Sequence, residues 1–158
     1  LPCTSLHHRL SQMFSGPLIA TSGNRHDERI CYENQQAFDE LSDFADYFLC
    51  HDREIIRPLD DSIARIIAGE PSWFRCGRGI APIQMKFAAL GKESLSTGAL
   101  MKNSFALCDG ENLIVSQHIG ELSSPAVLLS HKRERESLLK LTGIEPREYI
   151  ADLHPDAE

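Results

Sequence analysis

The sequence predicts an α/β fold, because strand and helix patterns alternate in both halves of the chain. In the first half, apolar runs at residues 17–20 and 47–50 flank a helical pattern that begins at Asn34. In the second half, a hairpin signal at residues 104–116 precedes a helical stretch and an apolar run at residues 149–151. Alternation of this kind is typical of helices that cover a sheet.

The first half predicts two short strands around one helix. Residues 17–20 are apolar and lead into Thr-Ser-Gly-Asn, which indicates a buried strand that ends in a loop. Asn34 can cap a helix whose apolar face extends from Ala37 to Phe48. The run at residues 47–50 then predicts a strand directly after the helix.

The middle of the chain predicts a boundary between two domains. An apolar run at residues 63–67 is closed by Gly69 and Pro71, and scattered glycine, proline and arginine then break the pattern. We therefore expect a domain at residues 1–71, a connector at residues 72–94 and a second domain at residues 95–158.

The second half predicts a hairpin, a long helix and a strand. Asp109-Gly110 between two apolar runs favours a tight hairpin turn. Ser124 and Pro125 fit the N-cap and the first residue of a helix, and Gly143 fits its C-terminal stop. The run at residues 149–151 adds the strand.

Composition disfavours several classes of protein. A net charge of −7 argues against non-specific binding to nucleic acid or to anionic membranes. No apolar run approaches the roughly 20 residues of a membrane-spanning helix, so we expect no membrane association. The five cysteines include no Cys-x-x-Cys pair, which predicts reduced thiols in a cytoplasmic protein.

Two polar segments of the first half could bind an anionic ligand. Ser22 and Asn24 flank a glycine after the first predicted strand, and small polar side chains there suit a nucleotide phosphate. Arg57 precedes the turn Asp60-Asp61-Ser62; arginine binds phosphate, and a carboxylate can hold a metal ion or a ribose hydroxyl. Ordinary turn chemistry and exposed ion pairs explain the same residues at least as well.

The second half offers one further segment and two histidines. Lys102-Asn103 opens the predicted hairpin and could meet a phosphate, although a solvated strand end has the same composition. His118 and His154 each lie near a carboxylate but lack the i, i+4 spacing of a helical metal site. We therefore assign no metal ligand in this chain.

The order of these motifs resembles that of HypF-type carbamoyltransferases. The first half resembles the later part of the YrdC-like domain of that family, and the second resembles the opening of its actin-like (ASKHA-type) domain. The matching segments are Leu-His-His at 6–8, Ala-Thr-Ser-Gly-Asn at 20–24, His-Asp-Arg at 51–53, Asp-Asp-Ser-Ile at 60–63, Arg-Gly-Ile-Ala-Pro at 78–82, Lys-Asn-Ser-Phe at 102–105, Ser-Gln-His-Ile-Gly-Glu-Leu at 116–122 and Asp-Leu-His-Pro-Asp at 152–156. The resemblance implies a partial YrdC-like sheet, then the first hairpin, helix and strand of an actin-like domain.

The resemblance also implies a reaction in two stages. The YrdC-like domain makes carbamoyl adenylate from carbamoyl phosphate and ATP, with Mg²⁺ expected. The ASKHA-type domain passes the carbamoyl group to the C-terminal Cys of the partner HypE, which leads to the cyanide ligands of nickel–iron hydrogenases. The family's zinc fingers and several further parts lie outside the matching segments, so this segment alone is expected to lack a complete site.

Matching positions imply roles for individual residues. Contacts with the nucleotide or the carbamoyl group are expected for Ser22, Asn24, Arg57, Asp60, Asp61 and Ser62. Catalytic roles are expected for Lys102 and Asn103. The chain departs from the family at Leu100, where an acidic residue is usual, and at Ile80, where Tyr is usual.

Other functions stay open. A stand-alone YrdC-type enzyme that makes threonylcarbamoyl adenylate for tRNA would share residues 21–24 but not residues 116–122. A non-catalytic remnant that binds nucleotide weakly is a further alternative. Double-stranded RNA, to which YrdC-like domains are linked, is disfavoured as a partner by the acidic net charge.

Overall fold

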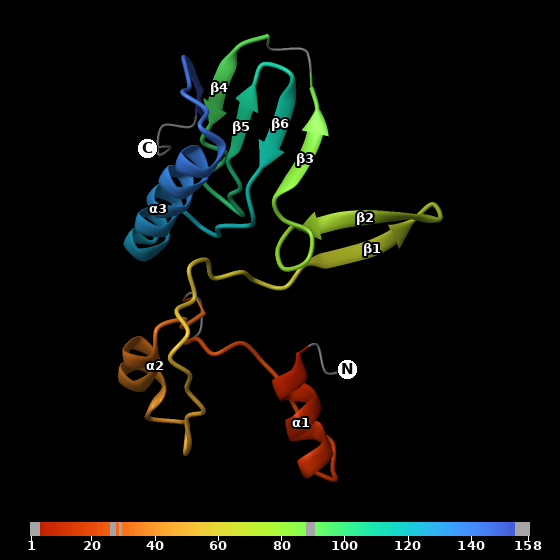
Figure 1. The fold of residues 1–158 in the computed structure, drawn as a ribbon, viewed down its shortest axis with the longest axis vertical. Helices are drawn as coiled ribbons and strands as arrows, with labels where there is room; N and C mark the ends of the chain where they lie inside the picture. The colour runs from red at the N-terminus through yellow and green to blue at the C-terminus, as the bar shows by residue number, and fades with distance from the viewer. Residues whose placement is uncertain (1–3, 26–27, 29, 88–90, 154–158) are drawn as a thin grey trace. The chain divides into compact units, whose positions relative to one another are not determined.

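The chain forms two compact units, Leu1–Arg53 and Glu54–Glu158. A computed structural model describes residues 4–25, 28, 30–87 and 91–153 (Figure 1). Helices and strands are both present, which confirms the predicted α/β class. None of the helices in these ranges is long and apolar enough to cross a membrane.

The first unit contains helices α1 (Ser5–Met13) and α2 (Asn34–Leu41). The Thr4 hydroxyl caps α1 by accepting a hydrogen bond from the amide of His7 at 3.1 Å. Asn34 is the first residue of α2 rather than its cap, and its side chain donates to the carbonyl of His51. Leu41 is the one buried hydrophobic residue among those described in this unit.

The two strands predicted for the first unit are wrong. Residues 17–20 and 47–50 form no ladder in the structure, and Ile19 is 98% exposed. Apolar composition alone does not make a strand, because the backbone of a strand needs a neighbouring strand to satisfy its hydrogen bonds.

Helix α2 is also shorter than predicted. The carbonyl of Leu41 accepts hydrogen bonds from the amides of Phe44 and Ala45, so the chain turns where the helix was expected to continue. Phe48 nevertheless packs on the helix, edge to face with Phe38, at 5.0 Å between ring centroids. The apolar pattern therefore reported a packed face but not the length of the helix.

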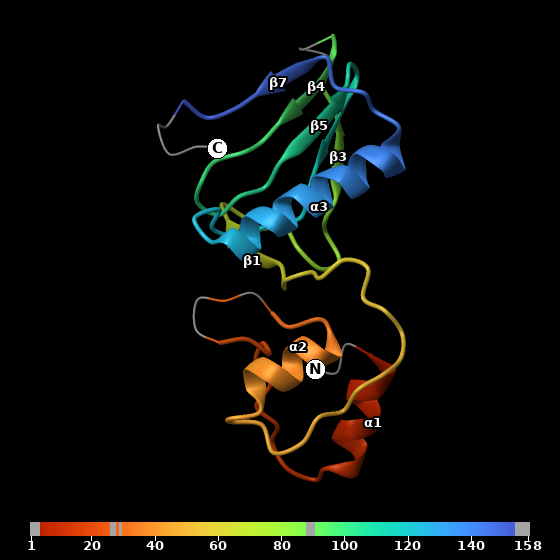
Figure 2. The ribbon, with the colours of Figure 1, turned by 90° about the vertical axis from the view of Figure 1, so that its left-hand side faces the viewer.

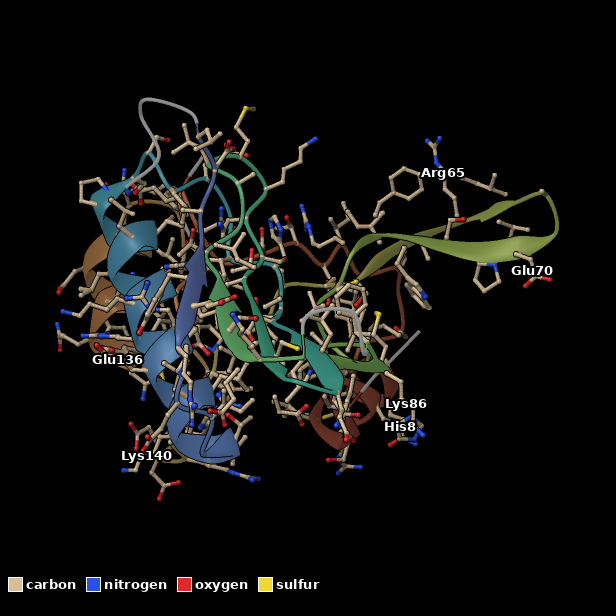
Figure 3. All side chains as sticks on the ribbon, turned by 90° about the horizontal axis from the view of Figure 1, so that it is seen from above. His8, Arg65, Glu70, Lys86, Glu136 and Lys140 are labelled. Carbon is tan, nitrogen blue, oxygen red and sulfur yellow. The ribbon has the colours of Figure 1, made fainter. Side chains whose placement is uncertain are left out.

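The second unit begins with a hairpin of β1 (Ile63–Ile67) and β2 (Glu70–Arg75), which projects from the rest of that unit (Figure 1). Ala68 and Gly69 connect the strands with φ of 52° and 87°, as a two-residue type I′ turn requires. Arg65 and Glu70 stand on this projection (Figure 3). The apolar run at residues 63–67 is thus a strand that pairs with its neighbour.

The unpatterned segment expected at residues 72–94 is largely structured. It contains most of β2, all of β3 (Ile83–Lys86) and the start of β4 (Glu93–Ser96). Its glycines and prolines fall mainly in the loops between these strands, where they serve as turn residues.

Strands β3, β4, β5 (Ala106–Asp109), β6 (Asn112–Val115) and β7 (Glu148–Ile150) form a sheet in the order β3-β6-β5-β4-β7. Only β7 pairs in parallel, with β4. Asp109 organises the β5–β6 turn, and hydrogen bonds from the side chain and amide of Asn112 and the amide of Glu111 hold the pKa of its carboxyl below the usual value. The hairpin and the strand predicted near residue 149 are confirmed.

Helix α3 (Pro125–Thr142) packs across one face of this sheet (Figure 2). Ser124 is its N-cap, and Gly143 ends it with a φ of 69°, so the predicted helix is confirmed from start to stop. Helix, sheet and loops share one apolar core of Leu95, Phe105, Leu107, Ile119, Leu122, Val127, Leu138 and Ile144.

Candidate functional site

The predicted turn Asp60-Asp61-Ser62 lies at the base of the β1–β2 hairpin. The Ser62 hydroxyl accepts a hydrogen bond from the amide of Gly77 at 2.9 Å and donates to the carbonyl of Arg78 at 3.0 Å. The amide of Arg78 donates in turn to the carbonyl of Asp60 at 2.8 Å. The two ends of the hairpin are thereby held side by side.

Gly77 makes this close approach possible. A Cβ at position 77 would lie 2.2 Å from the carbonyl oxygen of Asp60. At the surface of the turn, the Asp61 carboxylate lies 3.7 Å from the Arg78 guanidinium, and both side chains are exposed. Such a guanidinium can bind a phosphate and such a carboxylate can accept from a hydroxyl, whereas Ser62 is committed to protein hydrogen bonds.

Asn103, a predicted catalytic residue, is buried, with 1% of its surface exposed. Its side-chain nitrogen donates to the carbonyls of Thr97 and Ala99 at 2.9 and 2.7 Å. Its Oδ1 has no hydrogen-bond partner among the residues that the structure describes. The side chain therefore shapes the loop between β4 and β5, and its catalytic role stays a prediction.

Lys102 presents an exposed side chain from this loop. Its backbone has a φ of 50°, and its amide donates to Oε1 of Glu121 at 3.2 Å. Leu100 packs against the core, and its carbonyl accepts from the amide of Leu122. The loop is thus held by hydrogen bonds and carries an exposed ammonium group that can bind an anion. Leu100, at the position where the sequence departs from the expected acidic residue, contributes packing.

Residues 116–122 make hydrogen bonds both to the base of the β1–β2 hairpin and to the Lys102-Asn103 loop. The amide of His118 donates to the carbonyl of Cys76, beside the hairpin base, at 2.8 Å. The amide of Ile119 donates to the carbonyl of Asn103, and the amide of Asn103 donates to the carbonyl of Gly120, each at 2.8 Å. One short segment therefore connects the hairpin base to the Lys102-Asn103 loop.

His131 of α3 supports the same loop, although the sequence patterns did not single it out. It is 6% exposed, lies edge to face with Phe105, and places Nε2 at 3.2 Å from the carbonyl of Thr97. A carbonyl only accepts, so Nε2 carries the hydrogen. Burial holds the pKa of His131 below its ordinary 6.5, and its charged neighbours in the sequence give no sign that it faces inward.

Arg57, predicted to contact nucleotide, contacts helix α3, and its nucleotide contact stays a prediction. Its Nη2 donates to Oγ of Ser137 at 2.7 Å, and its Nε lies 3.6 Å from Oε2 of Glu134. Contacts between residues so far apart in the chain have no signature in local sequence patterns.

Ser22 and Asn24 lie in the first unit, in a loop that folds back on itself. The Asn24 side chain donates to the carbonyls of Arg25 and Glu28 at 2.8 and 2.9 Å, while Ser22 is exposed. Farther along, burial and the neighbouring Glu40 raise the pKa of the Cys31 thiol to about 11, which disfavours its thiolate. The loop therefore offers a hydroxyl rather than a reactive sulfur.

Side chains that bind metal ions are not clustered in the described part of the chain. Within residues 4–25, 28, 30–87 and 91–153, no group of three or more His, Cys, Asp or Glu side chains could hold a metal ion. His154, one of the two histidines considered from the sequence, lies outside the described residues.

Two family models match successive parts of the chain. Residues 1–77 match the Sua5/YciO/YrdC model, described as telomere recombination. Residues 89–158 match the model described as the HypF Kae1-like domain.

Individual proteins are similar along nearly the whole chain. The carbamoyltransferase HypF of Synechocystis is 40% identical over 157 residues, which are 99% of this chain and 20% of that protein. HypF2 of Cupriavidus necator is 36% identical over 93% of this chain and 19% of its own length. A crystal structure of full-length HypF in the phosphate- and nucleotide-bound form matches 99% of this chain and 25% of that one, with a TM-score of 0.89 and 31% identity. The crystal structure of HypF from T. kodakarensis matches 85% of this chain and 18% of that one, with a TM-score of 0.75 and 32% identity.

Proposed function

Because this chain belongs to the HypF carbamoyltransferase family, we propose that it takes part in carbamoyl transfer. It would supply some of the residues of an adenylation site and the first residues of a carbamoyl-transfer site. The presence of both family segments in one chain supports this proposal. The chain spans about a fifth of the length of the relatives that it matches, so the proposed activity is that of the full-length protein.

The proposed chemistry has two group transfers. Water hydrolyses carbamoyl phosphate to carbamate and inorganic phosphate; an oxygen of the carbamate then attacks the α-phosphorus of ATP, and pyrophosphate leaves. The thiolate of the C-terminal Cys of a HypE acceptor then attacks the carbonyl carbon of the carbamoyl adenylate, and AMP leaves. The first step moves negative charge from a carbamate oxygen to pyrophosphate, and the second moves it from the thiolate sulfur to a phosphate oxygen of AMP. Positioned hydrogen-bond donors and cations can stabilise the charge that develops on these oxygens.

Two separate groups of residues would serve the first transfer: Ser22 and Asn24 in the first unit, and the hairpin base in the second. The exposed Ser22 hydroxyl can donate to a phosphate or carbamoyl oxygen, and Asn24 holds the loop that presents it. At the hairpin base, the exposed Arg78 guanidinium offers donors to a phosphate, and Asp61 offers an acceptor. Asp60 and Ser62 shape that turn through the hydrogen bonds that close it.

The second transfer would use the Lys102 ammonium to offset charge on the leaving AMP or on the carbamoyl oxygen. Asn103 and Glu121 would hold the backbone that presents it.

The observation that carries the proposal is the segment at residues 116–122. Its hydrogen bonds reach the hairpin base through Cys76 and the Lys102-Asn103 loop through Ile119 and Gly120. A stand-alone YrdC-type enzyme gives no reason for such a continuation, and the match at residues 89–158 further favours the two-stage reaction.

The test is a chimera in which this chain replaces the matching 157 residues of the Synechocystis HypF. We expect it to catalyse ATP–pyrophosphate exchange that depends on carbamoyl phosphate. Ser22→Ala should lower the exchange rate by about tenfold or more, as loss of a positioned donor does. Asn24→Ala should also lower it, because it removes the hydrogen bonds that hold the loop presenting Ser22.

Gln35→Ala changes another exposed polar residue of the first unit and serves as the control. Exchange that survives both the Ser22 and the Asn24 substitutions would contradict the site assignment. A chimera without exchange, alongside an active parent, would contradict the function.

A further inference from the structure

A single arginine joins the start of the second unit to its long helix. Arg57 donates to Ser137 at 2.7 Å and lies 3.6 Å from the carboxylate of Glu134. Both partners belong to α3, three residues apart, and therefore lie on neighbouring positions of one helix face.

The pair is too enclosed to be an incidental surface contact. The Glu134 side chain is 8% exposed and that of Arg57 is 30% exposed. A carboxylate so far removed from water is retained only when a cation or strong donors compensate it. Among the described residues, Arg57 supplies the cation that pairs with Glu134, so its release would leave that charge buried.

The residues after Arg57 in the chain are held as well. Pro58 is buried and has a restricted backbone, and Asp60 accepts from the amide of Arg78. The carbonyl of Cys76, next along this hairpin base, accepts from the amide of His118. Arg57 thus ties the start of this segment to helix α3, and Cys76 ties its end to the loop that follows β6.

These residues belong by sequence to the first family segment, which matches through residue 77, yet they pack within the second structural unit. We propose that Arg57 is a positioning residue whose contacts with Glu134 and Ser137 lock the hairpin base onto helix α3. The junction between the two family segments is then a rigid joint, and Arg57 acts by orientation and not as a nucleotide ligand.

Hydrogen exchange on the full chain tests the joint directly. The reporters are the amides of Gly77, Arg78 and His118, whose acceptors all lie at the joint. Arg57→Met should raise their exchange rates by about tenfold or more, because it leaves a buried carboxylate without its cation. Unprotected reporters in the wild type, or rates unchanged by Arg57→Met, would overturn the proposal.

A double-mutant cycle separates the pair from general damage. Arg57→Met combined with Glu134→Gln should exchange no faster than Arg57→Met alone, and the reversed pair Arg57→Glu with Glu134→Arg should recover part of the protection. Glu136→Gln is the matched control, because Glu136 is exposed on the same helix (Figure 3). If the two substitutions change the amide exchange rates additively, and the reversed pair recovers no protection, the proposed coupling between Arg57 and Glu134 is wrong.

A comparison of kinetic constants in the chimera, which rests on the proposed function, separates positioning from ligand binding. Arg57→Met and Glu134→Gln should both lower kcat for carbamoyl transfer and leave the KM for ATP near its original value. A higher KM for ATP with Arg57→Met alone would make Arg57 a ligand instead. Absence of ATP–pyrophosphate exchange in the unsubstituted chimera would count against the proposed function. The hydrogen-exchange rates of the full chain would still show whether Arg57 holds the hairpin base on helix α3.

Discussion

Two buried polar side chains meet at one backbone carbonyl in the second unit. The carbonyl of Thr97 accepts from Nδ2 of Asn103 at 2.9 Å and lies 3.2 Å from Nε2 of His131. A carbonyl can accept two hydrogen bonds, so both donors fit. His131 differs from Asn103 in one respect, because its ring can take up a proton.

This difference predicts a pH dependence of stability. The folded pKa of His131 lies below 6.5 because burial disfavours the imidazolium. Between that pKa and 6.5 the unfolded chain binds more protons than the folded chain, so the free energy of unfolding rises with pH. The contribution is complete above 6.5 and is lost as the pH falls through this window. Urea unfolding at about pH 5.5 and about pH 7.5 measures the difference.

His131→Gln isolates the contribution of this residue. Glutamine can still donate to Thr97 but does not titrate, so the change in stability between the two pH values should shrink. His8→Gln makes the same chemical change at an exposed position of α1 and serves as the control. A pH dependence that is identical in the wild type and His131→Gln would rule out this origin.

At the scale of elements, two glycines with left-handed backbones predict unequal costs of substitution. Gly98 has a φ of 78°, and a Cβ there would lie 2.2 Å from the carbonyl oxygen of Ser104 and 2.7 Å from Nδ2 of Asn103. Gly143 has a φ of 69°, but a Cβ added there would meet no described heavy atom within 4 Å. The first glycine permits a close contact inside the loop, and the second only ends a helix.

Gly143→Ala should therefore cost about 1 kcal/mol, because a residue with a side chain is strained in a left-handed backbone. Gly98→Ala should cost about 2–4 kcal/mol, because steric overlap adds to the same backbone strain. Guanidinium unfolding of both variants measures the difference between them. Equal losses would mean that the loop between β4 and β5 relaxes freely around the added carbon.

Elements with their own start and stop signals could be predicted from sequence. Ser124-Pro125 and Gly143 delimit α3, and Asp109-Gly110 forms the turn of the β5–β6 hairpin, because capping and turn chemistry act locally. The strands expected at residues 17–20 and 47–50 depended on partners elsewhere, which a single apolar run does not specify. Local sequence signals therefore predict where a helix begins and ends and where a hairpin turns, but not whether an apolar run finds a strand to pair with.

The candidate site shows the same division. The turn Asp60-Asp61-Ser62 is contiguous in sequence, and the hairpin of β1 and β2 brings it back to Gly77 and Arg78. The partners of Arg57 lie 77 and 80 residues away, as the positions of Glu134 and Ser137 show, and the inward face of His131 depends on how α3 packs. These features follow from tertiary packing and have no local signature.

At the scale of the whole molecule, the family boundary and the structural boundary fall at different places. The first family segment matches through residue 77, whereas the second compact unit begins at Glu54. Apart from Leu41, every buried hydrophobic residue among those described belongs to the second unit. The apolar core therefore predicts that the second unit carries most of the cooperative stability.

This division predicts how two shortened chains will behave. A chain of residues 54–158 should unfold cooperatively and keep the amide chemical shifts of residues 91–153 found in the full chain.

A chain of residues 78–158 removes the hairpin and Arg57 and leaves Glu134 without its cation. Its free energy of unfolding should fall by about 1–3 kcal/mol relative to residues 54–158, allowing for the partial exposure of Arg57. In the shorter chain, Glu134→Gln should recover part of that loss, because it removes the unpaired charge. Equal stability of the two chains would mean that the family boundary, and not the joint at Arg57, delimits the folding unit.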